Sequence, residues 1–531
     1  MAERIVIDPL TRIEGHLKIE VEVENGVVKD AWCAGTMARG WEILLRDRDP
    51  RDAPYVCSRV CSVCEGVHAI ASSQALDDAF GVNIPEAGRI MRNLFCAGLY
   101  MHDHFIQFYV LSALDYIDIM AVANYKGSDA GLLAVKDKIV GLVNKNDTAP
   151  FTPRYTPDEY CVADPDIVTT LVSHYIKAVE MKAKSHKMLS ILTGIQPTAN
   201  SIMPGGCSAT PTAQQLSEFR TLWQEQLDFV TNTYLPDVLF VGKGPLLPLA
   251  LSGFGKGNTN YLCYPMFPQH DSSSAADRSF GGSNHLMGGG VVIGGSAKQS
   301  VDYSKITEDV KYTWSNYPVG TNSLHPSVGV TEFAPKKIGD AYSFVKAPRY
   351  NGLTVEVGPL ARGMVNINTS TYNVLKDLVS QGAQPGVVAR HLCRALEAKA
   401  VGDAGLAWID RLIELATAGP IVGMKDVPVP GSAKGMGAWD APRGALAHWV
   451  DIDGGRIKNY QLVVPSTWNQ SPRDSKGIRG QNEEALIGAP VPDVNNPINL
   501  VRIVRSFDPC LACAIHLIDP KTNDIKVFKV G

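Results

Sequence analysis

Asp508-Pro509-Cys510-Leu511-Ala512-Cys513, near the end of this chain, repeats a pattern that first occurs at Arg59-Val60-Cys61-Ser62-Val63-Cys64. Two residues separate the cysteines of each pair, a spacing that lets both thiolates reach one metal centre from a single tight turn. A histidine follows each pair, His68 after the first and His516 after the second. Two such pairs at opposite ends of the sequence predict a fold that brings its ends together around one buried metal site.

The cysteine spacing alone leaves several kinds of site open. A structural zinc site of four cysteines has the same ligand count, although zinc ribbons usually hold both pairs in one small module. A thioredoxin-type redox motif needs no second pair, and a c-type haem needs a histidine directly after its second cysteine, which neither pair has. A redox metal centre, a zinc site and a chain without metal therefore all remain hypotheses at this point.

The composition is that of an ordinary globular protein. The chain has 531 residues, of which 45% are hydrophobic and 20% charged, and its formal net charge of −4 indicates no nucleic-acid partner. Its 11 cysteines are an odd number, which argues against a disulfide framework. We find no long apolar run typical of a membrane span and no signal-peptide pattern, so we expect either a cytoplasmic chain or one exported with a signal-bearing partner.

The hydrophobic pattern predicts a mainly α fold with peripheral β strands, an α+β protein whose single large domain has an intertwined helical core. Alternation over residues 16–33 around Asn25-Gly26 predicts a β-hairpin. Helical spacing of apolar residues predicts helices at 86–118, 164–193, 211–233, 369–380 and 385–417. We expect Pro211 at a first helical position, an irregular loop with one short strand at 281–296, and short strands and loops over the last hundred residues.

Segments along the whole chain resemble nickel–iron hydrogenase large subunits. The matching segments are Thr11 to His16, Ala38 to Glu42, Arg59 to His68, His102 to His104, Pro348 to Tyr350, Glu356 to Arg362, Ala441 to Gly444, Val464 to Asn469 and Asp508 to His516. The resemblance implies a catalytic subunit that splits hydrogen heterolytically and reversibly, in the uptake direction, and passes electrons to an iron–sulfur small subunit.

The same resemblance gives the four cysteines unequal roles. Cys61 and Cys510 match terminal nickel ligands, and Cys64 and Cys513 match cysteines that bridge nickel and iron, as soft thiolates can. The iron of this family carries CO and CN⁻, which maturation proteins must supply because no side chain does. Position 510 is written as cysteine, so the selenocysteine variant is not supported.

Four residues match the acid–base and charged groups of the family's site. Glu14 matches the proton-relay glutamate, and a carboxylate beside a metal-bound thiolate can accept its proton. Arg443 matches an arginine above the open coordination position, whose guanidinium can polarise hydrogen or donate to cyanide. Asp103 and Asp508 match the carboxylates that pair with this arginine and orient it.

The surroundings of the centre are also implied by the resemblance. Ser466 and the backbone around Pro442 and Pro465 match the pocket that holds cyanide by hydrogen bonds. His68 is expected to hydrogen-bond a bridging cysteine rather than to bind metal.

A second metal position and a processing site are implied near the C-terminus. Glu42, the backbone carbonyl of Leu462 and His516 match a magnesium site, and because histidine is less typical of magnesium, iron is an alternative there. The family's endopeptidase cuts after the residue that corresponds to His516, before Leu517. We therefore expect a mature domain of residues 1–516 and a propeptide, 517–531, that keeps the second cysteine pair open until the metals are loaded.

The expected partners follow from the missing electron relay. The chain has no further cysteine set for iron–sulfur clusters, so a small subunit must complete a heterodimer, or a dimer of heterodimers, and pass electrons to a cytochrome or other acceptor. Export with a signal-bearing small subunit predicts a periplasmic or membrane-associated enzyme rather than a cytoplasmic one. Two alternatives are a non-catalytic hydrogen sensor, which lacks such a tail, and a quinone-reductase relative, which lacks the cysteine pairs.

Overall fold

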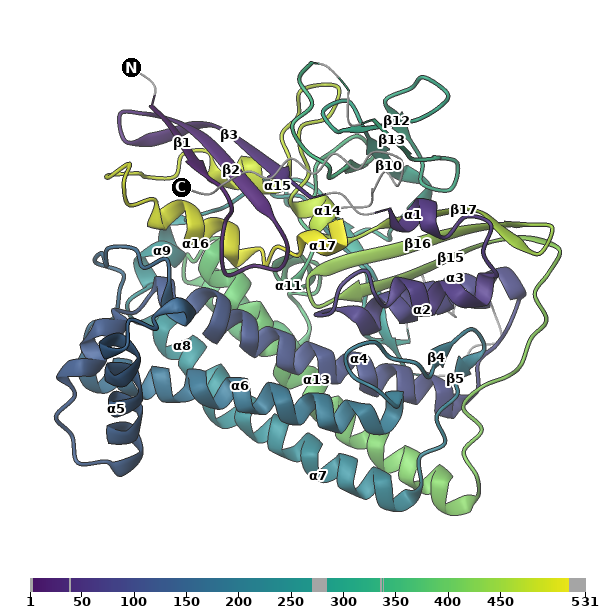
Figure 1. The fold of residues 1–531 in the computed structure, drawn as a ribbon, viewed down its shortest axis with the longest axis horizontal. Coiled ribbons are helices and arrows are strands. Elements are labelled where there is room, and N and C mark those ends of the chain that lie inside the picture. The colour runs from purple at the N-terminus through teal and green to yellow at the C-terminus, as the bar shows by residue number, and fades with distance from the viewer. Residues whose placement is uncertain (1–2, 38–39, 270–283, 335–336, 338, 515–531) are drawn as a thin grey trace.

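Four long helices form a layer on one side of the molecule, and most of the sheets lie on the other side (Figure 1). These helices are α4 (Glu86–Ile106), α6 (Pro165–Thr193), α7 (Ala213–Phe229) and α13 (Val387–Ala418). The structure is a computed structural model that describes residues 3–37, 40–269, 284–334, 337 and 339–514. The long helices that the sequence predicts are confirmed, although α4 continues as a π-helix from Gln107 to Ser112.

Capping groups explain where two of these helices begin. The Asp164 side chain accepts two backbone N–H groups at the start of α6, which satisfies donors that a helix end leaves open. The prediction that Pro211 is the first residue of α7 is wrong, because the helix begins at Ala213. Thr212 and Gln215 form a reciprocal capping box there, and this fixes the start after the proline.

The N-terminal sheet has the predicted hairpin. Its strands β1 (Glu3–Ile7), β2 (Leu17–Glu24) and β3 (Val27–Gly35) pair antiparallel in that order. Asn25 and Gly26 form the turn with φ values of 52° and 71°, the conformation that a tight hairpin turn requires.

A second sheet contradicts the prediction of short strands near the C-terminus. Its strands are long: β15 (Ser432–Ala441), β16 (Gly444–Asp453) and β17 (Arg456–Val463). Most of β16 is buried on both faces, so its sequence does not alternate between apolar and polar residues. Helix α3 (Glu65–Phe80) covers one face closely, because a Cβ atom on Gly437 would lie 2.0 Å from the Ala71 carbonyl oxygen.

Shorter elements complete the fold. The other helices are α1 (Trp41–Leu44), α2 (Ala53–Cys57), α5 (Ala130–Asn144), α8 (Leu235–Lys243), α9 (Leu247–Ser252), α11 (Pro359–Val365), α12 (Asn373–Ser380), α14 (Pro465–Asn469), α15 (Gln481–Leu486), α16 (Ile498–Ser506) and α17 (Leu511–Ala514). The other strands are β4 (Ile202–Met203), β5 (Gly206–Cys207), β6 (Tyr261–Cys263), β7 (Met266–Pro268), β8 (His285–Met287), β9 (Gly290–Val292), β10 (Ile306–Asp309), β11 (Ser315–Asn316), β12 (Ser323–Leu324), β13 (Glu332–Phe333) and β14 (Ala347–Tyr350). The region 281–296 thus contains two short strands rather than one; its first three residues lie outside the described part.

One large hydrophobic core joins the two ends of the chain. It includes Leu10 and Leu17 from the N-terminal segment together with Leu511 and Ala514 from the last described helix. The predicted class, mainly α with peripheral β, is confirmed. Among the described helices, none is long and apolar enough to cross a membrane.

Candidate metal centre

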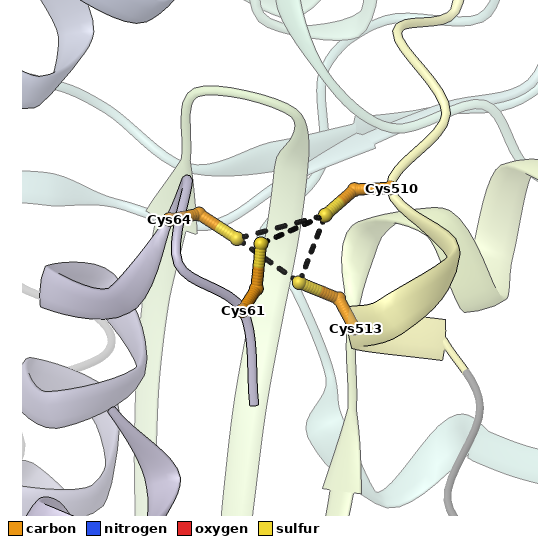
Figure 2. A group of neighbouring side chains, drawn as sticks. All are labelled: Cys61, Cys64, Cys510 and Cys513. Carbon is orange, nitrogen blue, oxygen red and sulfur yellow. Dashed lines mark hydrogen bonds between the residues drawn. The ribbon is translucent and has the colours of Figure 1, made fainter. Parts of the chain in front are cut away.

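Four cysteine sulfurs lie together in the interior, two from each end of the chain (Figure 2). Cys61 Sγ is 3.2 Å from Cys510 Sγ, and Cys64 Sγ is 3.0 Å from Cys513 Sγ. All four sulfurs lie within 4.8 Å of one another, and each residue is at most 5% exposed. All four are free thiols, since these separations exceed the ~2.05 Å of a disulfide bond. Four soft donors in one closed pocket fit a thiophilic metal centre.

Turns and helix ends present these sulfurs from two sides. Cys61 lies in the turn between α2 and α3, and Cys64 occupies the position just before α3 begins. Cys510 lies after α16, and Cys513 is on the single turn of α17. Asp508 adopts a positive φ of 56°, which turns the chain between those two helices. We call residues 507–514, which carry the second cysteine pair, the cysteine arm.

Glu14 connects the N-terminal segment to the cysteine arm. Its backbone N–H donates to the Pro509 carbonyl at 3.2 Å, and its own carbonyl accepts from Leu511 N–H at 2.8 Å. Its carboxylate Oε2 accepts from Ala512 N–H at 2.9 Å and lies 3.1 Å from Cys510 Sγ. The carboxylate is therefore held in hydrogen-bond contact with one sulfur of the cluster.

Burial shapes the acidity of these groups. Burial raises the pKa of the Cys510 and Cys513 thiols well above the ordinary value. Burial opposes ionisation of Cys61 too, but hydrogen bonds from its neighbours outweigh it, so the pKa of Cys61 is well below its usual value. Burial, and then the charge of Cys61, raise the pKa of Glu14. A bound cation would be needed to ionise all four thiols together.

Arg443 lies beside the cluster between two carboxylates. Its Nη1 is 3.1 Å from Asp103 Oδ2, and its Nε is 3.1 Å from Asp508 Oδ2. Burial disfavours the cation, but Asp508 and then Asp103 keep the pKa of Arg443 well above its usual value. Against the cost of burial, His102 and then Arg443 keep the pKa of Asp103 well below the ordinary range. The guanidinium is thus a fixed, buried cation.

The three residues of the expected cyanide pocket lie in two places: Pro465 and Ser466 form the start of helix α14, and Pro442 lies in the turn between β15 and β16. Ser466 Oγ accepts the backbone N–H of Cys510 at 2.9 Å, and Pro465 begins helix α14. The Pro442 carbonyl accepts from Arg362 Nη2 at 2.9 Å. Arg362 is 1% exposed and also pairs with buried carboxylates, so it fixes the turn that precedes Arg443.

Glu42 lies in a separate buried cluster. Its Oε1 accepts from the Leu462 backbone N–H at 3.2 Å and from Lys346 Nζ at 3.1 Å. Lys346 also donates to Glu308 at 2.6 Å, and burial raises the pKa of Glu308 to about 7. Glu42 Oε2 and Glu308 Oε1 have no hydrogen-bond partner within the described ranges. Two such oxygens fit a hard cation, whose expected third ligand, His516, lies outside the described residues.

His68 points at the cluster from α3. Its Nε2 lies 3.4 Å from Cys513 Sγ, so the histidine of the first motif touches the second motif. The proposed processing site, His516 and Leu517, and the tail 517–531 lie outside the described residues.

Comparison with known proteins identifies the family. A family model described as nickel-dependent hydrogenase matches residues 39–516. The chain belongs to this family. A further model, described as HoxL-like, matches residues 4–33.

Full-length relatives agree with this assignment. The hydrogenase chain is 36% identical to the periplasmic NiFeSe hydrogenase large subunit of Desulfomicrobium baculatum, over 99% of this chain and 97% of that protein. It is 33% identical to the hydrogenase-2 large chain of Escherichia coli K12, over 100% of both. The solved Ni-Fe-Se hydrogenase of D. vulgaris Hildenborough has a TM-score of 0.82 at 38% identity, over 97% of this chain and 100% of that one. The chain is a hydrogenase large subunit.

Sequence reasoning missed several groups around the hydrogenase site. Lys346 contacts both Glu42 and Glu308, but Lys346 and Glu308 lie outside the matching segments, the nearest of which begins at Pro348. Arg362 ends the matching segment Glu356 to Arg362, but nothing in the sequence indicates that its guanidinium donates to the Pro442 carbonyl. His448 lies 3.3 Å from His68, and nothing in the spacing of these residues along the chain indicates that contact.

Gly15 is the position where the hydrogenase's N-terminal segment passes closest to the cysteine arm. It has a φ of +81°, and a Cβ atom there would lie 2.7 Å from Ala512 N. We expect Gly15→Ala to cost about 1–3 kcal/mol from overpacking beyond the strain of a positive φ, and to lower bound nickel severalfold. The matched control is Gly81→Ala, since Gly81 has a φ of +66° and open space around it. Equal nickel content and equal melting temperature in the two variants would refute this expectation.

Proposed function

We propose that this hydrogenase large subunit oxidises hydrogen at a nickel–iron centre held by Cys61, Cys64, Cys510 and Cys513. The observation that carries the proposal is the buried cluster of four free sulfurs with a carboxylate in contact with one of them. A non-catalytic hydrogen sensor is not favoured, because relatives that match nearly the whole chain are named uptake hydrogenase large subunits.

The proposed ligand roles follow the order of the cysteines. Cys61 and Cys510 hold nickel, and Cys64 and Cys513 share it with an iron that carries CO and CN⁻. The sulfurs of Cys64 and Cys513 lie 3.0 Å apart, so one centre can reach both. When bound, the metal pair supplies the redox chemistry that removes two electrons from hydrogen.

The chain's own residues handle the proton. A proton on Cys510 Sγ moves to Glu14 Oε2, which is 3.1 Å away and already aligned by the amide of Ala512. The raised pKa of Glu14 suits a carboxyl that must hold a proton and release it again.

Charged and polar groups complete the proposed pocket. Arg443, held beside the sulfurs by Asp103 and Asp508, would polarise hydrogen bound at the centre. Ser466 and the backbone at Pro442 and Pro465 hold cyanide.

A magnesium or iron ion at the second position is proposed to bind Glu42, the Leu462 carbonyl and His516. The unpartnered Glu42 Oε2 supports a cation there. An ion at this place would tie α1 to the end of the cysteine arm.

The tail beyond His516 is proposed to be removed after metal loading. Cys513 is 2% exposed, whereas Asp519, Lys521 and Asp524 follow within a few residues and cannot be buried unpaired at low cost. An endopeptidase that cuts between His516 and Leu517 would remove these charged residues from the neighbourhood of the buried arm once the metals are in place.

The partners and the cellular location of the enzyme are proposed from its membership of the hydrogenase family. An iron–sulfur small subunit receives the electrons and passes them to a cytochrome or another acceptor. Export with that subunit places the enzyme in the periplasm or at the membrane, and maturation chaperones load the metals beforehand.

Metal analysis and infrared spectroscopy test the centre. The purified heterodimer should contain nickel, iron and magnesium and show CO and CN⁻ stretching bands. Cys510→Ser should abolish nickel loading and turnover, because a hydroxyl is a poor soft ligand. Cys161→Ser, at a half-buried cysteine outside the cluster, is the control and should keep both. Zinc in place of nickel, without these bands, would refute the proposal.

Glu14→Gln tests the proton relay. The amide keeps the shape of the side chain but cannot accept a proton, so we expect hydrogen oxidation to fall by about 10²–10⁴-fold. Nickel content and the infrared bands should stay as in the wild type. Glu24→Gln, on an exposed position of β2, serves as control. Turnover of Glu14→Gln at the wild-type rate would contradict the relay role.

Intact mass measurement tests processing and partnership. The active enzyme should contain a large chain that ends at His516 and a second, iron–sulfur chain, whereas protein made without nickel should keep residues 517–531. An active enzyme whose large chain still carries the tail would rule out the proposed cut.

A further inference from the structure

A line of hydrogen bonds leaves the metal centre at Cys513. Its sulfur lies 3.4 Å from His68 Nε2, and His68 Nδ1 lies 3.3 Å from His448 Nε2. His448 Nδ1 is 2.7 Å from the Tyr460 hydroxyl, which is 2.8 Å from Ser72 Oγ. Two imidazole rings and a phenol thus connect a metal-ligand sulfur to a serine.

The packing of α3 against the second sheet sets this line. His68 and Ser72 are four residues apart on α3 and therefore lie on one face of the helix. In the sheet, His448 pairs with Leu462 and Val450 pairs with Tyr460, so His448 and Tyr460 are diagonal neighbours on one face. The contacts therefore come from the register of β16 and β17.

The line ends inside the protein. His448, Tyr460 and Ser72 are 0% exposed, and the buried Cys57 thiol donates to the Tyr460 oxygen at 3.7 Å. A path that releases protons must reach water, and these residues do not. The line is thus suited to holding groups in place.

Hydrogen-bond accounting allows two directions along the line. A neutral imidazole has one N–H donor and one acceptor nitrogen. If Tyr460 donates to Ser72, each ring donates away from the centre and His68 Nε2 faces the sulfur as an acceptor. If Tyr460 donates to His448, each ring donates towards the centre and His68 Nε2–H points at Cys513. In the structure the Tyr460 hydroxyl is placed as the donor to Ser72, which corresponds to the first direction. With metals bound, the Cys513 thiolate would have no proton to donate, and this would select the second direction, in which the Ser72 hydroxyl donates to Tyr460 instead.

We propose that His448 and Tyr460 are positioning residues that fix His68 as a hydrogen-bond donor to the sulfur of Cys513. The hydrogen bond withdraws electron density from a sulfur that the metals share. This inference rests on the proposed function and adds two residues that lie outside every matching segment.

The electrostatics of both residues agree with this geometry. Burial, and then the neighbouring His68, lower the pKa of His448 well below its usual value, so the ring stays neutral. Burial, and then Cys57, raise the pKa of Tyr460 well above its usual value, so the phenol keeps its proton. Each therefore offers one donor, as the second direction requires.

Infrared spectra of Tyr460→Phe and His448→Leu heterodimers test the proposal. Without Tyr460 or His448, His68 is no longer held as a hydrogen-bond donor to the Cys513 sulfur, and more electron density stays on the sulfur and the iron. The CO band should therefore move to lower wavenumber, and the midpoint potential of the centre should become more negative. Nickel content should stay near wild type in Tyr460→Phe, with turnover reduced about 10- to 100-fold.

Two further variants separate hydrogen bonding from packing. His448→Gln keeps an N–H that can donate to His68, so its CO band should return towards the wild-type position. Tyr109→Phe removes another buried hydroxyl, which donates to Asp237 at 2.6 Å, and should leave the band unmoved. If the His448→Leu variant fails to load nickel, the CO band of Tyr460→Phe, compared with that of Tyr109→Phe, tests the proposal by itself.

The outcomes separate this inference from the proposed function. Wild-type protein without nickel or CO and CN⁻ bands would overturn the proposed function itself. A loaded wild type together with a Tyr460→Phe band no more shifted than that of Tyr109→Phe would overturn only the positioning role. Equal shifts in His448→Gln and His448→Leu would do the same, because packing rather than donation would then explain them.

Discussion

The junction between Glu14 and the cysteine arm is the contact on which the centre depends. Closing the chain across the sequence separation of 449 from Cys61 to Cys510 costs on the order of 5 kcal/mol in chain entropy. Backbone bonds from Glu14 offset part of this cost, and Asp115 binds both Arg12 at 2.5 Å and Arg505 at 2.8 Å. Because these partners precede Glu14 and Cys510 by only a few residues, the same junction holds the Glu14 carboxylate against the Cys510 sulfur.

Buried charge is the second constraint around the centre. Arg443 and Arg362 are almost fully buried, and each has two carboxylates within ion-pair distance. A buried ion pair contributes little net stability, but loss of one partner leaves an uncompensated charge that costs several kcal/mol. The main effect of these pairs is therefore to fix positions. Arg362 holds the Pro442 carbonyl in place, and the two carboxylates around Arg443 hold its guanidinium beside the sulfurs.

The sequence predicted what local patterns determine. The cysteine pairs, the hairpin at Asn25-Gly26 and the long helices all follow from spacing, turn chemistry and periodicity. The sheet around β16 could not be predicted in this way, because the sequence of a strand buried on both faces does not alternate between apolar and polar residues and resembles an irregular apolar segment. The start of α7 was misplaced because a proline near a helix start competes with a true cap at Thr212.

The contacts of His68 show why the rest of the site could not be predicted from the sequence alone. Its place four residues after Cys64 associates it with the first cysteine pair, yet its ring touches Cys513 of the second. The nitrogen on the other side of the ring faces His448, and that meeting depends on how β16 pairs with β17 and how Gly437 lets α3 approach the sheet. A change in sheet register by one residue would turn His448 away. The run of contacts from Cys513 through His68 to His448 is therefore a product of sheet register, which no motif around the cysteines encodes.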